Sequence, residues 1–203
     1  MSDIKDAWKN KKVFLKQLEY NLQELSSPER YPNHWKALLL CIEKTNAKSI
    51  LDIGCGCGAV SEVVRMNCPS VRYVGLDYSS DAIDLAKNTW GSSEFFVKDV
   101  MDLTENDVSS YDLLFSSAVF DVMPNGDEAL EHVMKICVGS FLLSRPKFTL
   151  SESHYTEYIA YDEIQTCAYY HSKNNFVDMC DKYGYTINVI GNDILLVKND
   201  KSI

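Results

Sequence analysis

The stretch from Ser49 to Gly58, Ser-Ile-Leu-Asp-Ile-Gly-Cys-Gly-Cys-Gly, constrains this chain more than any other. An apolar run carries one acid, Asp52, three glycines follow at alternate positions, and apolar residues at helical spacing begin at Ala59. This pattern predicts a buried strand, a tight turn and the start of a helix. Because glycine lacks a Cβ atom, such a turn can take positive φ and bring bare backbone against a ligand. The first amide groups of the helix point toward the same place.

The spacing of the glycines indicates which of two kinds of ligand this turn would bind. A dinucleotide-binding turn has the form Gly-x-Gly-x-x-Gly and seats a pyrophosphate on the helix N-terminus. Here the order is Asp52-x-Gly54-x-Gly56-x-Gly58, with an acid two residues before the first glycine. A carboxylate at that position would repel a pyrophosphate, but it suits a ligand that carries an ammonium group. The segment also fits an ordinary strand-turn-helix unit without a ligand.

Two more acids follow predicted strands. The strand 71–77 ends at Asp77, and the strand 94–98 is followed by Asp99. In a doubly wound sheet the carboxyl end of the second strand lies beside the first turn, so we expect Asp77 close to the glycines. A carboxylate there can accept both hydroxyls of a ribose, and Asp77 comes nineteen positions after Gly58, near the spacing of such contacts.

Together, the three glycines and the acids Asp52, Asp77 and Asp99 resemble the class I S-adenosylmethionine-dependent methyltransferases, over about residues 49–198. The resemblance implies a three-layer α/β fold whose doubly wound, seven-stranded sheet has the order 3-2-1-4-5-7-6, with strand 7 antiparallel. It implies S-adenosyl-L-methionine as cofactor and S-adenosyl-L-homocysteine as product. In that family the acid after the third strand binds the adenine amino group and the next residue packs on the ring, a pattern that Asp99 and Val100 match.

The resemblance places the cofactor contacts in the glycine turn and directly after strands. The implied cofactor-binding residues are Asp52, Gly54, Cys55, Gly56, Gly58, Asp77, Tyr78, Asp99, Val100 and Ser116. The segment after the strand 111–116 carries the methyl-transfer chemistry in the resembling fold. Asp121 in this segment and His154 further along are candidate catalytic bases, and His34 is a third option.

Candidate acceptor-binding residues come from two regions. Tyr31, His34 and Trp35 belong to N-terminal helices that could form part of a lid, and Arg145, Tyr155 and Tyr158 belong to an aperiodic aromatic segment, 145–161. A long segment at the edge of a site is suited to substrate binding. The alternative for both regions is packing alone, with the helices burying the sheet and the aromatic segment covering its edge.

The hydrophobic pattern of the remaining segments predicts one compact domain overall. We expect an N-terminal helical cover over residues 1–46, with helices over 6–25 and after Pro32, and a methyltransferase domain over 47–200. Further helices are predicted over 59–66, 81–90, 127–138 and 162–182, and further strands over 48–53 and 141–144. A closing hairpin over 185–190 and 194–198 around Gly-Asn-Asp distinguishes this sheet from the all-parallel dinucleotide-binding sheet.

The composition limits the classes of partner that we expect this chain to bind. The 203 residues are 46% apolar, which suits one domain with a substantial core. The net charge of −9 argues against a nucleic-acid partner, and no apolar run is long enough to span a membrane. The seven cysteines form no Cys-x-x-Cys pair, so we expect reduced thiols and no metal in a cytoplasmic protein without a secretory signal.

We therefore predict a transferase of the EC 2.1.1 type, which transfers a methyl group to an O or N atom of a small-molecule or glycan-linked acceptor. The later half of the chain is similar to small bacterial methyltransferases that modify metabolites or surface glycans. The alternative is a non-catalytic module that keeps the cofactor fold for binding or scaffolding. The sequence does not address the oligomeric state.

Overall fold

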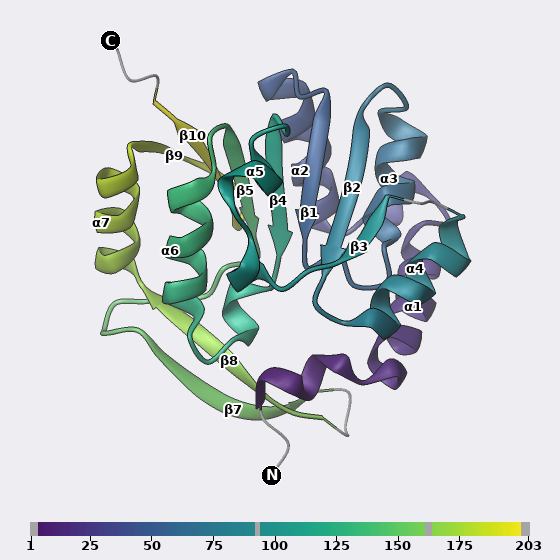
Figure 1. Cartoon of the computed structure of the whole chain (residues 1–203), viewed down its shortest axis with the longest axis horizontal. Helices are drawn as coiled ribbons and strands as arrows, with labels where there is room; N and C mark the ends of the chain where they lie inside the picture. The colour runs from purple at the N-terminus through teal and green to yellow at the C-terminus, as the bar shows by residue number, and fades with distance from the viewer. Residues whose placement is uncertain (1–3, 92–93, 161–163, 200–203) are drawn as a thin grey trace.

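The computed structural model describes residues 4–91, 94–160 and 164–199, and the structural statements below refer to these ranges. Its central element is a seven-stranded sheet (Figure 1). In spatial order the strands are β3 (Phe95–Val97), β2 (Arg72–Asp77), β1 (Ser49–Ile53), β4 (Leu113–Ser117), β5 (Ser140–Ser144), β10 (Asp193–Lys198) and β9 (Tyr185–Ile190). β10 is antiparallel to both neighbours, and the strands from β3 to β5 are parallel. The predicted order 3-2-1-4-5-7-6 is confirmed, with β9 as the sixth strand and β10 as the seventh.

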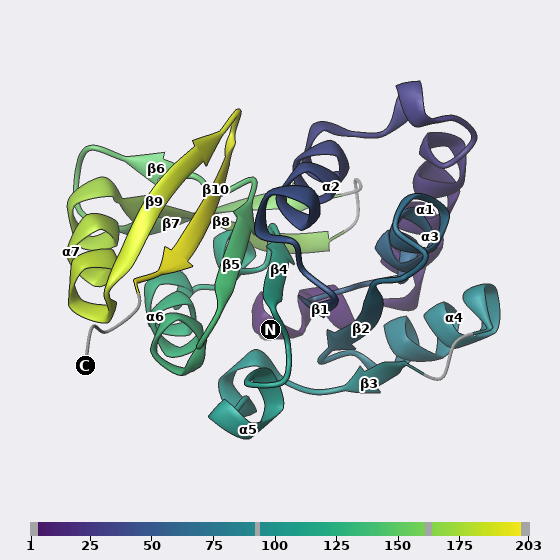
Figure 2. The same ribbon diagram turned by 90° about the horizontal axis from the view of Figure 1, so that it is seen from above.

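Helices cover both faces of the sheet, as the view in Figure 2 shows for α2 and α3 on one side and α5 and α6 on the other. The first layer consists of α2 (Asn33–Thr45), α3 (Ala59–Asn67) and α4 (Ser80–Trp90), and the second of α5 (Glu105–Val108), α6 (Gly126–Ile136) and α7 (Lys173–Tyr183). An outer helix, α1 (Lys11–Glu24), packs against α3 and α4. The predicted division at residue 46 stays a prediction, and residue 200 at its far end lies outside the described residues.

The parallel strands are apolar on both faces because each face meets a helical layer. In β1, Leu51 and Ile53 pack with α6, while Ile50 packs with α2 and α3 on the other side. Phe115 of β4 joins the same cluster as Ile50. With both faces buried, a central strand can present polar groups to a ligand only at its end.

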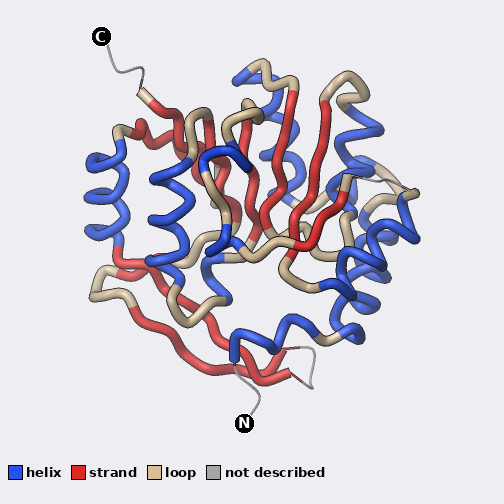
Figure 3. The backbone as a smooth tube through the Cα atoms, viewed as in Figure 1, coloured by secondary structure: helices blue, strands red, loops and turns tan. Residues whose placement is uncertain are grey.

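A second, three-stranded sheet lies across the carboxyl ends of the first, as Figure 3 shows. It contains β6 (Phe148–Thr149), β8 (Ile164–Ser172) and β7 (His154–Ala160), in the order β6-β8-β7. The N-terminal 3₁₀ helix Ile4–Lys9 contacts β8. Trp8 and Val13 of the N-terminal region pack with Ala160 and Ile164 of the strand pair. We call the 3₁₀ helix together with β7 and β8 the edge cover.

The prediction of one helix over residues 162–182 is wrong. β8 occupies Ile164–Ser172, and α7 begins only at Lys173; residue 162 lies outside the described residues. The aromatic segment that the sequence left aperiodic contains β6 and β7, and β7 pairs with β8 along its length. Tyr169 and Tyr170 of β8 lie opposite Tyr155 and His154 of β7. Aromatic residues favour strands when such cross-strand partners exist, and this pairing decides the conformation.

Candidate functional site

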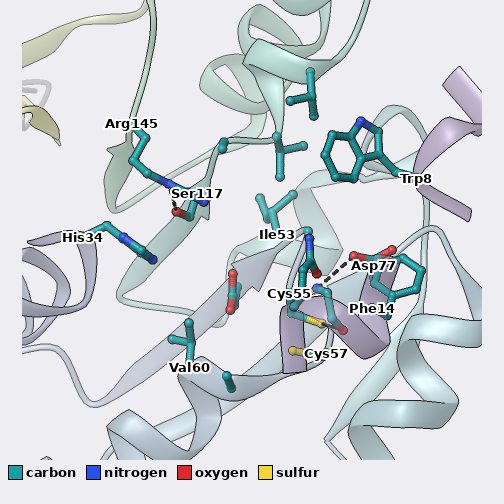
Figure 4. Close-up of a pocket in the computed structure, with 18 of the residues that line it drawn as sticks. Trp8, Phe14, His34, Ile53, Cys55, Cys57, Val60, Asp77, Ser117 and Arg145 are labelled. Atoms are coloured by element: carbon teal, nitrogen blue, oxygen red, sulfur yellow. Dashed lines mark hydrogen bonds between the residues drawn. The ribbon is translucent and has the colours of Figure 1, made fainter. Parts of the chain in front are cut away.

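A cavity of about 750 Å³ lies between the carboxyl ends of the main strands and the edge cover (Figure 4). Its wall takes residues from the glycine turn after β1, from the ends of β2 to β5, from α1 and α2, and from β7. This volume falls within the range of small-molecule and cofactor sites. The fold therefore gathers the predicted strand-end acids Asp52, Asp77 and Asp99 around one cavity.

The glycine turn presents one of its three glycines to this cavity without obstruction. Gly56 has φ +55° and lines the wall, and a Cβ atom there would meet only the Gln17 side-chain oxygen, at 3.1 Å. A Cβ on Gly54 would collide with Val119. Gly58 caps α3, and a Cβ there would lie 2.7 Å from Phe95, so Gly58 serves packing. Gly56 is therefore the position where bare backbone faces the cavity.

Asp77 joins the glycine turn to the end of β2. Its Oδ2 accepts a hydrogen bond from the Gly56 amide at 2.9 Å, and its Oδ1 accepts one from the Ser79 amide at 2.9 Å. Burial raises the pKa of Asp77, and these two amide donors act in the opposite direction. Each carboxylate oxygen keeps further acceptor capacity. Asp77 can thus fix the turn and still accept hydrogen bonds from a bound molecule.

Two more predicted residues extend the wall beyond β3. Asp99 and Val100 both line the cavity, and the Asp99 Oδ1 accepts a hydrogen bond from the Met101 amide at 3.0 Å. Tyr78 lines the wall between them and the end of β2. The arrangement offers an acceptor and an apolar surface side by side, which suits a flat heterocycle with an exocyclic amine.

Asp52 is the acid of the glycine motif, and it is buried at the cavity wall. Its carboxylate accepts a hydrogen bond from the Tyr73 hydroxyl. Burial raises its pKa from an ordinary value of 3.8 to about 7, and the negative charge of Asp77 adds to the rise. A cationic group bound beside Asp52 would favour its ionised form.

Asp52→Asn should stabilise the ligand-free protein at pH 8. With a folded pKa of about 7 against 3.8, wild-type folding takes up a proton between those values, so the free energy of unfolding falls as pH rises through that window. Asparagine removes this penalty, which is about 4 kcal/mol at most. Denaturant unfolding should show that the free energy of unfolding falls less between pH 5 and pH 8 in the variant than in the wild type. Equal decreases in both proteins would contradict the prediction.

The other end of the cavity is built from β4, β5 and α2, where Figure 4 shows Arg145, Ser117 and His34 facing one another. The Arg145 Nε donates to the Ser117 Oγ at 3.0 Å, and the Arg145 backbone amide donates to the Asp193 Oδ1 at 3.0 Å. Arg145 has φ +60°, which is unusual for a residue with a side chain and is typical of functional sites. Burial, followed by the nearby Arg145 charge, lowers the pKa of His34 to about 3, so its ring is neutral.

Six predicted site residues do not appear on the cavity wall: Gly58, Ser116, Tyr31, Asp121, His154 and Tyr155. Asp121 is 1% exposed and pairs with the wall residue Lys147, with Nζ 2.6 Å from Oδ2. His154 is exposed on β7, where its ring stacks on Tyr170. Tyr31 is buried, and its hydroxyl accepts a hydrogen bond from the Asn67 side chain. The other predicted residues line the cavity, and their roles stay predictions.

Sequence reasoning missed a polar face of α1. Gln17, Asn21 and Glu24 line the cavity and follow one another at three- and four-residue spacing. That spacing places them on one side of a helix, and it was the available signal. Trp8 and Lys147 were missed as well, and nothing in their local sequence marks them.

Within the described ranges, no group of three or more His, Cys, Asp or Glu residues is arranged to hold a metal ion. No helix of the described part of the chain has the length and apolar character needed to cross a membrane.

Comparison with known proteins agrees with this geometry. Residues 51–138 match the family model described as a methyltransferase domain. The chain is 35% identical over 88 residues to malonyl-acyl-carrier-protein O-methyltransferase 2 of Ilyobacter polytropus, an alignment covering 42% of this chain and 33% of that protein. It is 30% identical over 88 residues to trans-aconitate 2-methyltransferase of Afipia carboxidovorans, covering 43% and 34%. The chain thus aligns with about a third of the length of these curated relatives.

A solved structure extends the similarity to the whole fold. An S-adenosylmethionine-dependent methyltransferase from Clostridium acetobutylicum superposes with a TM-score of 0.64, at 12% identity, over 94% of this chain and all of that one. At that identity the likeness speaks for the fold. Residues 51–138 thus match a methyltransferase domain, and the sheet order and superposition show the fold of the class I S-adenosylmethionine-dependent methyltransferases, which supports S-adenosylmethionine as the cofactor.

Proposed function

We propose that this chain transfers the methyl group of S-adenosylmethionine to an O or N atom of a small-molecule acceptor. The observation that carries the proposal is the convergence of Gly56, Asp77 and Asp99 on one cavity of about 750 Å³ that continues to Arg145 and His34. The first three suit a nucleoside with a cationic tail, and the continuation leaves room for a second molecule. The names of the two relatives, which specify a malonyl and an aconitate acceptor, are consistent with an acceptor of this kind.

The residues present fit the cofactor. Asp77 would accept the ribose hydroxyls, Asp99 the adenine amino group, and Val100 would support the ring. Asp52 and the Gly56 backbone would meet the methionine part, with its ammonium group beside a buried carboxylate. A Cβ at position 56 would occupy part of this space. The cofactor supplies an activated sulfonium methyl group.

The chain has three tasks in this chemistry. It must align the acceptor atom with the methyl group, exclude water and, for an acceptor that carries a proton, remove that proton. Trp8, Ile159 and Ala160 of the edge cover lie on the cavity wall and contribute apolar surface against water. Neither Asp121 nor His154 lies on that wall, which is the observation favouring the second candidate function, a cofactor-binding module without catalysis.

Calorimetry followed by an activity assay tests the proposal. S-adenosylmethionine and S-adenosylhomocysteine should bind with micromolar affinity, and NAD should not bind. Release of S-adenosylhomocysteine in the presence of a panel of hydroxy acids, amines and sugars should then identify acceptors. Binding without release would favour the non-catalytic module, and absence of cofactor binding would exclude both functions.

Asp121→Asn should slow methyl transfer while cofactor affinity stays within about twofold. Its buried carboxylate pairs with Lys147, a residue of the cavity wall, so the variant frees that lysine to move. We expect a decrease in kcat of roughly tenfold, the cost of about 1.4 kcal/mol of misplacement. Lys147→Gln is the matched variant. Equal decreases in kcat in the two variants would indicate that Asp121 acts by positioning Lys147. A much larger decrease in kcat in Asp121→Asn alone would indicate that Asp121 is a base.

A further inference from the structure

The cavity wall carries three strand-end carboxylates toward one end of the main-sheet edge and two cations toward the other, and Lys98, the wall cation beside Asp99, is paired with Asp107. Asp99 follows β3, Asp77 lies at the end of β2, and Asp52 belongs to β1. Arg145 and Lys147 follow β5, two strands beyond β1. Neighbouring strands are about 4.8 Å apart, so the acidic and basic ends are separated by about the length of a small molecule.

A cavity with an acidic end and a basic end can bind two ligands of opposite charge side by side. The cationic cofactor, laid over β3, β2 and β1, would occupy the acidic end. The acceptor would then lie over β4 and β5, beside Arg145. A guanidinium there contrasts with the whole chain, whose net charge is −9. The position of Arg145 therefore reflects a local requirement of the cavity.

Arg145 differs in its partners from two other cations of the cavity wall, Lys147 and Lys98. Lys147 is paired with Asp121, and Lys98 is paired with Asp107. Among the residues that the structure describes, Arg145 has no carboxylate within ion-pairing distance, and its side chain donates through Nε to Ser117. The terminal nitrogens of its guanidinium can form the two parallel hydrogen bonds that a carboxylate accepts.

The backbone around Arg145 holds the side chain in this place. Its left-handed φ of +60° is fixed by the amide hydrogen bond to Asp193, which is 3% exposed. On the neighbouring strand end, Ala118 has φ +59°, and its amide donates to the Ser144 carbonyl oxygen at 3.1 Å. Two residues with side chains thus take a costly conformation at adjacent strand ends, and both line the cavity.

We propose that the acceptor of this enzyme is a carboxylate, bound by the Arg145 guanidinium beside His34 and methylated on one of its own oxygens. The inference rests on the proposed function. A carboxylate oxygen attacks the sulfonium methyl carbon, the new C–O bond forms as the C–S bond breaks, and the electron pair of that bond returns to sulfur. The products are a methyl ester and S-adenosylhomocysteine, and no proton is released.

This chemistry does not require a strong base at the acceptor end. Asp121 and His154 lie off the described cavity wall, and His34, whose pKa is lowered to about 3, is a weak base. An alcohol or ammonium acceptor would need proton removal, whereas a carboxylate is already ionised at neutral pH. Joining an anion and a cation into two neutral products is also favoured where the surroundings are less polar than water.

The test uses the complex of the full chain with S-adenosylhomocysteine and three matched probes: benzoate, benzamide and phenyl phosphate. NMR titration, following the backbone amide signals of the residues around the cavity, should give a dissociation constant for benzoate at least tenfold lower than that for benzamide. Arg145→Gln should abolish the difference and keep the affinity for S-adenosylhomocysteine within about threefold. Arg30→Gln, an exposed arginine outside the cavity, is the control and should retain the preference.

Three results would overturn the proposal. Equal binding of benzoate and benzamide would exclude a carboxylate site, and tighter binding of phenyl phosphate would assign the site to phosphate. A tenfold loss of S-adenosylhomocysteine affinity in Arg145→Gln would mean that Arg145 holds the cofactor's own carboxylate. If that variant folds poorly, Ser117→Ala, which removes the Nε acceptor, should weaken benzoate binding selectively. Failure of wild type to bind S-adenosylhomocysteine would instead reject the proposed function itself.

Discussion

Gly56→Val should abolish binding of S-adenosylhomocysteine, with a loss of affinity of at least about 100-fold, while the domain stays folded. The valine side chain would enter the cavity where the backbone faces the ligand, and within the fold its Cβ would meet only the flexible end of Gln17. The strain of φ +55° in a β-branched residue costs about 1–3 kcal/mol, which a domain of this size can absorb. Calorimetry and circular dichroism of the same sample measure the two effects.

Gly58→Ala is the matched control for this prediction. Its Cβ would lie 2.7 Å from Phe95 and 2.9 Å from Ala86, in the packed interface between α3, α4 and β3. We expect this variant to lower Tm by several degrees, since overpacking costs about 1–3 kcal/mol, and to keep its affinity for the cofactor. If both variants lost binding equally, or if Gly56→Val bound normally, the cofactor would not lie against the glycine turn.

Asp77→Ala should weaken binding of S-adenosylhomocysteine by about 1–3 kcal/mol, or roughly 5- to 150-fold. The variant removes the carboxylate that would accept the ribose hydroxyls. It also removes the acceptor of the Gly56 amide, so the glycine turn loses a restraint at the point where it meets the ligand. Calorimetric titration of the two proteins under one condition measures the difference.

An exposed acid close to Asp77 provides the control for that variant. Asp81 lies in the first turn of α4 and is exposed, outside the cavity wall. Asp81→Ala changes the net charge by the same amount, so it should leave the dissociation constant unchanged within about twofold. A wild-type dissociation constant in Asp77→Ala would count against ribose binding at the end of β2.

The sequence predicted those parts of the fold that are encoded within short windows. The glycine turn after β1 and the acids at the ends of β2 and β3 follow directly from strand-turn-helix patterns, and the closing hairpin follows from two β-rich runs around a turn. The order of the strands came from the resemblance that these motifs carry. Parallel strands bring their carboxyl ends together, so Asp77 and Asp99 could be expected on one wall before any coordinates were known.

The sequence could not decide features that depend on partners far along the chain. Residues 164–172 form β8 because β7 is available to pair with them, and nothing within the segment itself excludes a helix. Asp121 was a reasonable base by position, yet folding buries it against Lys147. The local sequence also does not distinguish Gly56 from Gly58, although Gly56 faces the cavity and Gly58 faces Phe95.

What the sequence alone determined is the resemblance to the methyltransferases, the strand order that this resemblance implies, and the acids that form one end of the cavity. Tertiary structure decided the basic end, where Arg145 reaches its place through a left-handed backbone held by the distant Asp193, and the edge cover, where the N-terminal 3₁₀ helix meets β8. The physical reason is the range of the interactions. Turns and strand ends are fixed by neighbours in sequence, whereas a cavity wall is closed by contacts between segments that only the folded chain brings together.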